Sequence, residues 1–228
     1  PALIALKRLV YTDQSYVSDA EENNLTYNFT LAYKANNRIN TYATYSTSFK
    51  PVGVNVAGLP TINGQPATDL AVIKPEYVKH IEIGVKTSPT CKSTANLTFF
   101  NTDIDGYQTN VQSPELGVNR GYIANAEKVN VRGVELDVNI KANKFFNFYG
   151  ALTYTAGKYV TFTNAPLPLE ETGLTVDGVQ VAFKDISGER LPGISKWAGS
   201  MGGEFNTYGN FLRQKGKFFV AVDTYYRS

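Results

Sequence analysis

The sequence predicts an all-β protein, an antiparallel transmembrane β-barrel segment of about eight strands. Three observations lead to this prediction. Apolar and polar residues alternate with a period of two along most of the chain, and the alternating segments are long. The connections between them alternate between short and long. A tilted membrane strand needs about 9–11 residues, whereas strands of soluble proteins average about 5–6.

The first predicted strand covers residues 24–34. Its odd positions, from Leu25 to Tyr33, are apolar or aromatic, whereas most even positions are polar. Helical periodicity cannot produce this pattern, but a strand with one apolar and one polar face does. The next strand, 39–50, repeats the pattern, and the three residues 35–37 between them are typical of a tight hairpin turn.

Six further strands are predicted at about 75–87, 93–108, 121–141, 145–159, 192–206 and 215–228. Two of them do not alternate simply. In 121–141 the apolar parity switches between Val131 and Val134, which predicts a bulge near Arg132-Gly133, since glycine is common in bulges. In 93–108 the facing of the side chains stays open.

The connections predict how the sheet is oriented. The short ones are 35–37, 88–92, 142–144 and about 207–214, and the long ones are 51–73, 109–120 and 160–191. Short turns on one rim and long loops on the other are typical of outer-membrane barrels. The alternation then predicts lipid contact for Leu31, Val85, Leu152 and Val220, lumen contact for Thr30, Glu82, Thr153 and Ala221, and an interface girdle of Tyr33, Tyr45, Tyr77 and Tyr226.

Composition excludes several classes of protein. Of the 228 residues, 43% are hydrophobic and 13% aromatic, which is too apolar for a disordered chain. The net charge of +2 does not suggest a nucleic-acid partner. The single cysteine, Cys91, cannot form an internal disulfide, and with the single histidine, His80, it cannot make a zinc site. We therefore expect no metal site and no cofactor. The first residue is Pro1, so we expect a processed chain or a fragment.

Several short strings occur in a specific order. They are residues 40–51, Lys74-Pro75-Glu76, 82–87, 99–108, Asn125-Ala126, 132–136, Leu191-Pro192 and 225–228. Each string is unspecific alone. Together, in this order and spacing, they resemble the β-barrel of the TonB-dependent outer-membrane receptors of Gram-negative bacteria.

The resemblance implies a barrel of 22 strands with an N-terminal plug inside it. Residues 1–228 would form one partial barrel domain, with the plug domain absent and the remaining strands outside the chain. The implied function is TonB-dependent uptake of a scarce nutrient, such as an iron–siderophore complex, across the bacterial outer membrane. The implied partners are membrane lipid and lipopolysaccharide, the plug and the remaining strands, TonB, and a small-molecule ligand such as a ferric chelate. The sequence does not identify the substrate.

Candidate site residues are few. Tyr122, at the base of a long loop, and His80 with Glu82, on a polar strand face, are the candidate ligand-binding residues. Loop 160–191 has five carboxylates against two cations, a net charge of −3, and we expect it to be a mobile extracellular flap that captures ligand. Cys91 lies in a short turn with no expected role.

Catalysis is not expected, since a nucleophile–base pair would have to use His80. Two alternatives stay open: a soluble all-β ligand-binding module, for instance for carbohydrate, and a small membrane-barrel enzyme.

Overall fold

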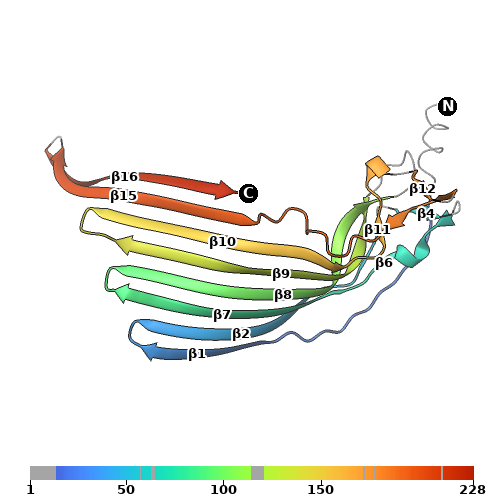
Figure 1. Cartoon of the computed structure of the whole chain (residues 1–228), viewed down its shortest axis with the longest axis horizontal. Coiled ribbons are helices and arrows are strands. Elements are labelled where there is room, and N and C mark those ends of the chain that lie inside the picture. The colour runs from blue at the N-terminus through green and yellow to red at the C-terminus, as the bar shows by residue number, and fades with distance from the viewer. Residues whose placement is uncertain are drawn as a thin grey trace.

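The computed structural model describes residues 14–228 except 57, 63–64, 114–120, 172, 177 and 212. Residues 1–13 of the predicted domain therefore lie outside the described part. Eight long strands form one antiparallel sheet in which neighbours along the chain are neighbours in space (Figure 1). They are β1 (Asn28–Asn36), β2 (Ile39–Lys50), β7 (Glu76–Thr90), β8 (Ser93–Gln112), β9 (Gly121–Lys141), β10 (Phe146–Thr161), β15 (Trp197–Phe211) and β16 (Gln214–Arg227).

All eight predicted strands are present, with shifted ends. The largest shift is in the strand predicted at 192–206, which begins at Trp197 and continues to Phe211. Residues 189–191, which precede this strand, hydrogen-bond to the end of β10. The Tyr159 amide donates to the Glu189 carbonyl at 2.9 Å, and the Leu191 amide donates to the Gly157 carbonyl at 3.0 Å. β8 is also longer than predicted and ends at Gln112.

The four short turns gather at one end of the sheet, here called the short-turn rim, and the long connections gather at the other, the long-loop rim (Figure 1). Small hairpins fold within the long connections. They are β3 (Gly53–Val54) with β6 (Val72–Ile73), β4 (Thr61–Ile62) with β5 (Gln65–Pro66), β11 (Ala165–Pro166) with β14 (Phe183–Lys184), and β12 (Thr175–Val176) with β13 (Val179–Gln180). Two short 3₁₀ helices, η1 (Thr68–Leu70) and η2 (Leu169–Glu171), accompany them.

One face of the sheet, the apolar face, consists of large hydrophobic side chains. The strand register places one side chain from each of seven strands in a continuous row: Leu31, Ala43, Ile83, Phe99, Val134, Tyr154 and Trp197. Leu31 is 65% exposed and Ile83 56%. A soluble sheet protein would bury such a face under a second layer, and the described residues provide none over it.

The opposite, polar face carries the alternate residues. One row contains Ala32, Tyr42, Gly84, Thr98, Glu135, Thr153 and Ala198. The predicted grouping of side chains is confirmed. Leu31, Val85, Leu152 and Val220 share the apolar face, whereas Thr30, Glu82, Thr153 and Ala221 share the polar face. The register also settles the facing of residues 93–108, since Leu97 and Phe99 lie on the apolar face and Phe100 on the polar one.

The predicted bulge near Arg132-Gly133 is wrong. The β8–β9 ladder keeps one register from Ser93 opposite Ile140 to Gln112 opposite Gly121. Val129 and Val131 therefore lie on the opposite face from Val134. Val129 has no exposed surface and packs in a cluster beneath the long loops, with Val131 against its edge. The switch in parity marks a change of surroundings along an unbroken strand.

The two faces thus exchange polarity at the same level along the strands. Between this level and the long-loop rim, polar side chains occupy the side of the sheet that carries the apolar face, among them Asn101, Asp103, Asn130 and Arg132. The apolar stretches that remain below are nine residues long on three strands, at 146–154, 197–205 and 218–226. Their length agrees with the 9–11 residues, approximately, that a tilted strand needs to cross hydrocarbon.

Aromatic side chains mark both ends of these stretches. Tyr154 and Trp197 lie 4.9 Å apart by ring centroids at the long-loop end, and Phe146 and Phe205 lie 5.0 Å apart at the other. Such bands are typical of residues at membrane–water interfaces. The register places the four tyrosines of the predicted girdle on the same side of the sheet as the apolar face: Tyr33, Tyr45, Tyr77 and Tyr226.

Leu152→Arg and Thr153→Arg test the two faces with adjacent residues. An arginine at position 152 should cost about 2–4 kcal/mol of folding free energy, because it places a charge in hydrocarbon, and an arginine at 153 much less. Urea titration of the lipid-reconstituted receptor measures both values. Equal costs would contradict the assignment of the faces.

Gly133→Ala tests a close approach on the polar face. An added Cβ would lie 2.3 Å from the Tyr154 carbonyl oxygen and 2.6 Å from Phe100 Cζ, so backbone must move. We expect a loss of about 1–3 kcal/mol in the same titration. Gly216→Ala is the control, since nothing lies within 4 Å of its added Cβ. Rescue of Gly133→Ala by Phe100→Leu would contradict the backbone origin of the strain.

Candidate functional site

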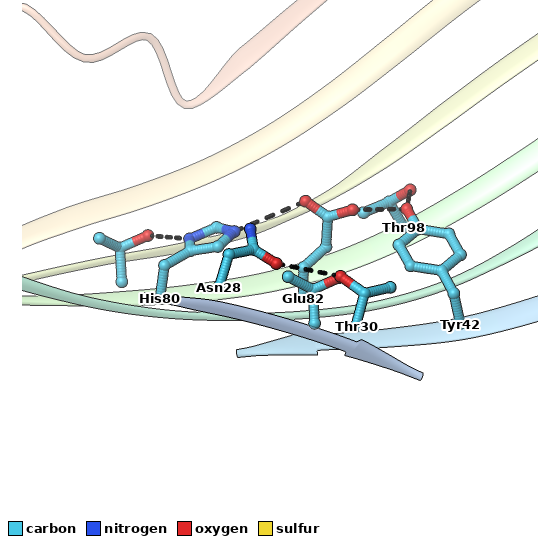
Figure 2. A network of polar contacts seen from close by, with 8 residues as sticks. Asn28, Thr30, Tyr42, His80, Glu82 and Thr98 are labelled. Atoms are coloured by element: carbon cyan, nitrogen blue, oxygen red, sulfur yellow. Dashed lines mark hydrogen bonds and ion pairs between the residues drawn. The ribbon is translucent and has the colours of Figure 1, made fainter. Parts of the chain in front are cut away.

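A group of hydrogen-bonded side chains occupies the polar face of β1, β2, β7 and β8 (Figure 2). We call it the polar-face network. Its members are Asn28, Thr30, Tyr42, Thr44, His80, Glu82, Thr98 and Thr102. They meet because alternate residues of a strand point to the same face, and the register sets the polar positions of four strands side by side.

The structure brings together two of the three predicted site residues. His80 Nε2 lies 3.5 Å from Glu82 Oε2, and His80 Nδ1 lies 2.8 Å from the Thr102 hydroxyl. The imidazole also stacks on Phe100, with ring centroids 6.5 Å apart. The two side chains are 29% and 32% exposed, so both remain accessible from the polar side.

Tyr42 extends this network from the neighbouring strand. Its hydroxyl donates to Glu82 Oε1 at 2.5 Å and lies 3.2 Å from the Thr98 hydroxyl. The ring crosses directly over Gly84, where an added Cβ would lie 2.4 Å from ring atom Cε1. Glycine at position 84 therefore allows the tyrosine to lie flat across the sheet and reach the carboxylate.

A second tyrosine of the same kind lies on the far strands. Tyr149 is opposite Gly202 in the ladder, and its hydroxyl donates to Asp223 Oδ1 at 2.5 Å. A Cβ on Gly202 would again fall within the ring, 2.5 Å from Tyr149 Cε2. Sequence reasoning missed both tyrosine–glycine pairs. The only signal in the sequence is a tyrosine at a polar-face position that stands opposite a glycine on the next strand. It can be recognised only once the register is known.

The chemistry of these groups is that of binding through hydrogen bonds. The polar-face network offers hydroxyls, carboxylates and one imidazole, and most of them already have a partner in the sheet. Within the described ranges, no group of three or more His, Cys, Asp or Glu side chains could hold a metal ion. The arrangement suits a wall that meets water, a ligand or another polar protein surface.

Tyr122, the third predicted site residue, lies far from the other two, at the long-loop end of β9. It is 3% exposed and sits among the loops, beyond the apolar stretch of the sheet. Burial, with a smaller contribution from the Asp69 carboxylate, raises the pKa of Tyr122 to about 12. Its hydroxyl therefore stays protonated at neutral pH, and little of its ring is available to a ligand in this arrangement.

The backbone next to Tyr122 is tied to the first long connection by an asparagine. Asn55 is 5% exposed, and its Nδ2 donates to the carbonyls of Leu70 and Ile123, at 2.9 Å each. The amide of Ile123 donates in return to Asn55 Oδ1 at 2.9 Å. One side chain thus replaces a stretch of backbone pairing between the connection and β9.

Two further amides act in the same way. Asn125 Nδ2 donates to the carbonyls of Lys74 and Gly106, and its Oδ1 accepts from the Lys74 amide at 2.9 Å. Gln108 Nε2 donates to the carbonyls of Pro51 and Lys74. We call Asn55, Gln108 and Asn125 the amide clamps. They hold the long-loop rim in place above β8 and β9.

Loop 160–191, predicted to be a mobile flap, is folded in its described part. Phe162, Ala165 and Leu191 pack with Val129 and Tyr159 in a buried cluster. This cluster lies on the same side of the sheet as the polar face, above the height where the polarity of the faces changes. The apolar residues of the loop therefore anchor it to the strands.

The acidic character of this loop is partly neutralised within it. Lys184 Nζ lies 2.8 and 2.7 Å from the two carboxylate oxygens of Glu171. Asp177, one of the five carboxylates counted in the sequence, lies outside the described residues. Cys91 is exposed in the turn between β7 and β8. In the described part of the chain, no helix is long and apolar enough to cross a bilayer.

Solved structures resemble this sheet. The chain matches the ferric yersiniabactin uptake receptor FyuA from Yersinia pestis (TM-score 0.55, 13% identity) over 87% of its own length and 29% of the receptor's. It matches the siderophore receptor PiuA from Acinetobacter baumannii (0.52, 18%) over 88% and 29%, and the copper transporter OprC (0.52, 14%) over 77% and 23%. The chain thus spans under a third of each protein, and at these identities the likeness concerns the fold.

Sequence comparison identifies the family. No curated protein sequence matches the chain significantly. The profile described as "TonB dependent receptor-like, beta-barrel" matches residues 7–228, nearly the whole chain. This family consists of receptors and transporters of the outer membrane, in agreement with the exposed apolar face and the two unequal rims. The chain belongs to the TonB-dependent receptor β-barrel family.

Proposed function

We propose that this chain is part of the barrel wall of an outer-membrane receptor that imports an iron–siderophore complex in a TonB-dependent manner. The observation that carries the proposal is the two-faced sheet itself. An exposed apolar face nine residues high, with aromatic bands at both ends, suits a wall between lipid and a polar lumen. The family match favours energy coupling through TonB.

The orientation follows from the rims. In bacterial outer-membrane barrels the short turns face the periplasm and the long loops face the exterior. The long-loop rim would therefore meet ligand outside the cell, and Cys91 would lie on the periplasmic side. The folded loop 160–191 and the connection 51–75 would contribute to the ligand-facing surface.

The polar face would line the lumen and contact the plug domain. His80 and Glu82 would act there by hydrogen bonding to the plug or to passing ligand, and Tyr122 would support the ligand-facing loops from below. Of the three structures reported above, FyuA is named as an uptake receptor for ferric yersiniabactin and PiuA as a siderophore receptor, which favours a ferric chelate as the substrate class. The third is named as a copper transporter, so the substrate must be tested directly.

The proposed orientation predicts the reactivity of Cys91. A membrane-impermeant maleimide added to whole cells should leave Cys91 unlabelled, and permeabilising the outer membrane should expose it. In a Cys91→Ser background, Thr163→Cys at the long-loop rim should label in whole cells. Labelling of Cys91 in whole cells, with none of Thr163→Cys, would reverse the orientation.

Removal of the loop tip tests capture and uptake. Residues 169–181 are replaced by Gly-Asn-Gly. This replacement keeps the hydrogen bond from the Leu167 amide to the Ala182 carbonyl and the buried cluster below it. We expect the barrel to fold and the affinity for a ⁵⁵Fe-labelled ferric siderophore to fall about tenfold, equivalent to about 1.4 kcal/mol.

The control carries two extra glycines in the turn between β9 and β10 and should bind as the wild type does. Unchanged affinity in the tip variant would remove the role of this loop in capture. Accumulation of ⁵⁵Fe that is equal in cells with and without TonB would overturn the proposed function.

A further inference from the structure

A pocket of about 370 Å³ lies on the polar face at the short-turn rim. It is bounded by the turn between β1 and β2 and by the adjoining ends of β7 and β8. Lys34, Arg38 and Lys86 line it, together with Asn40 and Asn96. The register sets all of these except Arg38 in one row across four strands, so strand alternation directs them to the same face. We call these five residues the basic pocket.

The three cations of the basic pocket have no carboxylate partner among the described residues. The ion pairs found there join other side chains. Arg38 Nη1 donates to the Pro89 carbonyl at 3.1 Å, a neutral acceptor that leaves the guanidinium charge uncompensated. Lys86 Nζ lies 5.2 Å from the centre of the Tyr42 ring. Each cation is therefore available to an anion from outside the sheet.

The carboxylate that continues the same row is already bonded. Asp137 stands opposite Asn96 in the ladder and accepts a hydrogen bond from Asn96 Nδ2 at 3.0 Å. It lies two strands from Lys86, about 10 Å away by backbone spacing. Like charges gathered on one wall repel one another, so an anion bound between them would lower their electrostatic energy.

The spacing of the cations indicates the kind of anion. Lys34 and Lys86 lie on strands separated by β2, so their backbones are about 10 Å apart. One carboxylate cannot lie close to both backbones, whereas a ligand with two or three carboxylates can span the distance. Arg38 adds a planar fork that matches the geometry of a carboxylate. The pocket volume falls within the range of about 300–1,000 Å³ that is typical of small-molecule sites.

The neighbouring turns extend the positive charge along this rim. Each of the four short turns contains a cation, and these cations are Arg38, Lys92, Lys144 and Arg213. A field of this sign draws anions toward the short-turn rim and raises their concentration there.

We propose that the basic pocket is an exit site of the lumen, which binds iron chelates that carry free carboxylates. The inference rests on the proposed function, because in that orientation the pocket lies where the lumen opens to the periplasm. Lys34, Arg38 and Lys86 pair with the carboxylates of a chelate that has passed along the polar face. The pocket thereby narrows the cargo to polycarboxylate chelates and gives the wall a second binding site, opposite the capturing loops.

The test uses the intact receptor that carries this barrel segment, with its plug, purified in mild detergent. It is titrated by calorimetry with tricarballylate, a small tricarboxylate, and with the uncharged trimethyl ester of that compound. An exposed ion pair contributes a few-fold to affinity, so the variant Lys34→Gln/Arg38→Gln/Lys86→Gln should bind tricarballylate about tenfold more weakly than the wild type. The ester should bind to neither protein.

A matched variant, Lys92→Gln/Lys141→Gln/Lys144→Gln, removes the same charge at neighbouring turns of the rim and should bind tricarballylate as the wild type does. In cells, the pocket variant should take up a ⁵⁵Fe-labelled polycarboxylate chelate with a maximal rate several-fold below that of the matched variant. The half-saturating concentration should stay the same, because the long-loop rim is unchanged.

Equal tricarballylate affinity in the pocket variant and the wild type would overturn the proposal. It would also be overturned if the pocket variant admitted vancomycin, a large antibiotic, into cells faster than the matched variant does. The three cations would then hold the plug in place and not a chelate.

Uptake in cells without TonB separates this failure from a failure of the proposed function. If uptake depends on TonB and the pocket variant keeps the full maximal rate, only the exit site is wrong. If uptake of ⁵⁵Fe is independent of TonB, the proposed function is wrong, and the titration of the purified receptor still decides whether the pocket binds carboxylates.

Discussion

The structure depends on one constraint, which is that backbone amides and carbonyls in hydrocarbon must find partners within the protein. An unpaired backbone amide or carbonyl in hydrocarbon costs roughly several kcal/mol. A sheet can therefore cross the membrane only as a continuous ladder of hydrogen-bonded strands. Eight strands of this chain meet the constraint between β1 and β16. The register is interrupted only near the rims, as between Thr87 and Thr90 beside the ladder-breaking Pro89, and between Tyr159 and Thr161. The outer edges of β1 and β16 have no ladder partner in the described chain, so a closed wall requires further strands.

The same ladder passes through two different surroundings. Over nine residues, the apolar side chains point outward and the polar ones inward. Beyond Gly133 toward the long loops the arrangement reverses, and Val129 joins a buried cluster like that of a soluble domain. The strands therefore act as membrane wall in one part and as scaffold for the loops in the other. This explains why β8 and β9, with 20 and 21 residues, exceed what a bilayer needs.

Much of this could be read from the sequence, because a period of two survives in any two-faced strand. All eight strands, both faces and the pairing of His80 with Glu82 follow from parity alone. The switch between Val131 and Val134 was misread as a bulge, since a shift in register and a change of surroundings leave the same trace in a sequence. The tyrosine–glycine pairs and the amide clamps could not be predicted, because both depend on which residues of distant strands stand opposite one another. The fold of loop 160–191 was missed for a related reason: its apolar residues, such as Phe162 and Leu167, are scattered among turn-forming ones.

The amide clamps have a consequence for the conditions under which the loops keep their shape. Asn55, Gln108 and Asn125 are uncharged and do not titrate, and each holds backbone groups through its side-chain amide. Lowering the pH does not protonate the hydrogen-bond acceptors of these contacts, and added salt does not screen them. The amide clamps are therefore insulated from the changes in acidity and ionic strength that a cell surface meets. Charged contacts on the same rim, such as Lys184 with Glu171, remain free to respond to them.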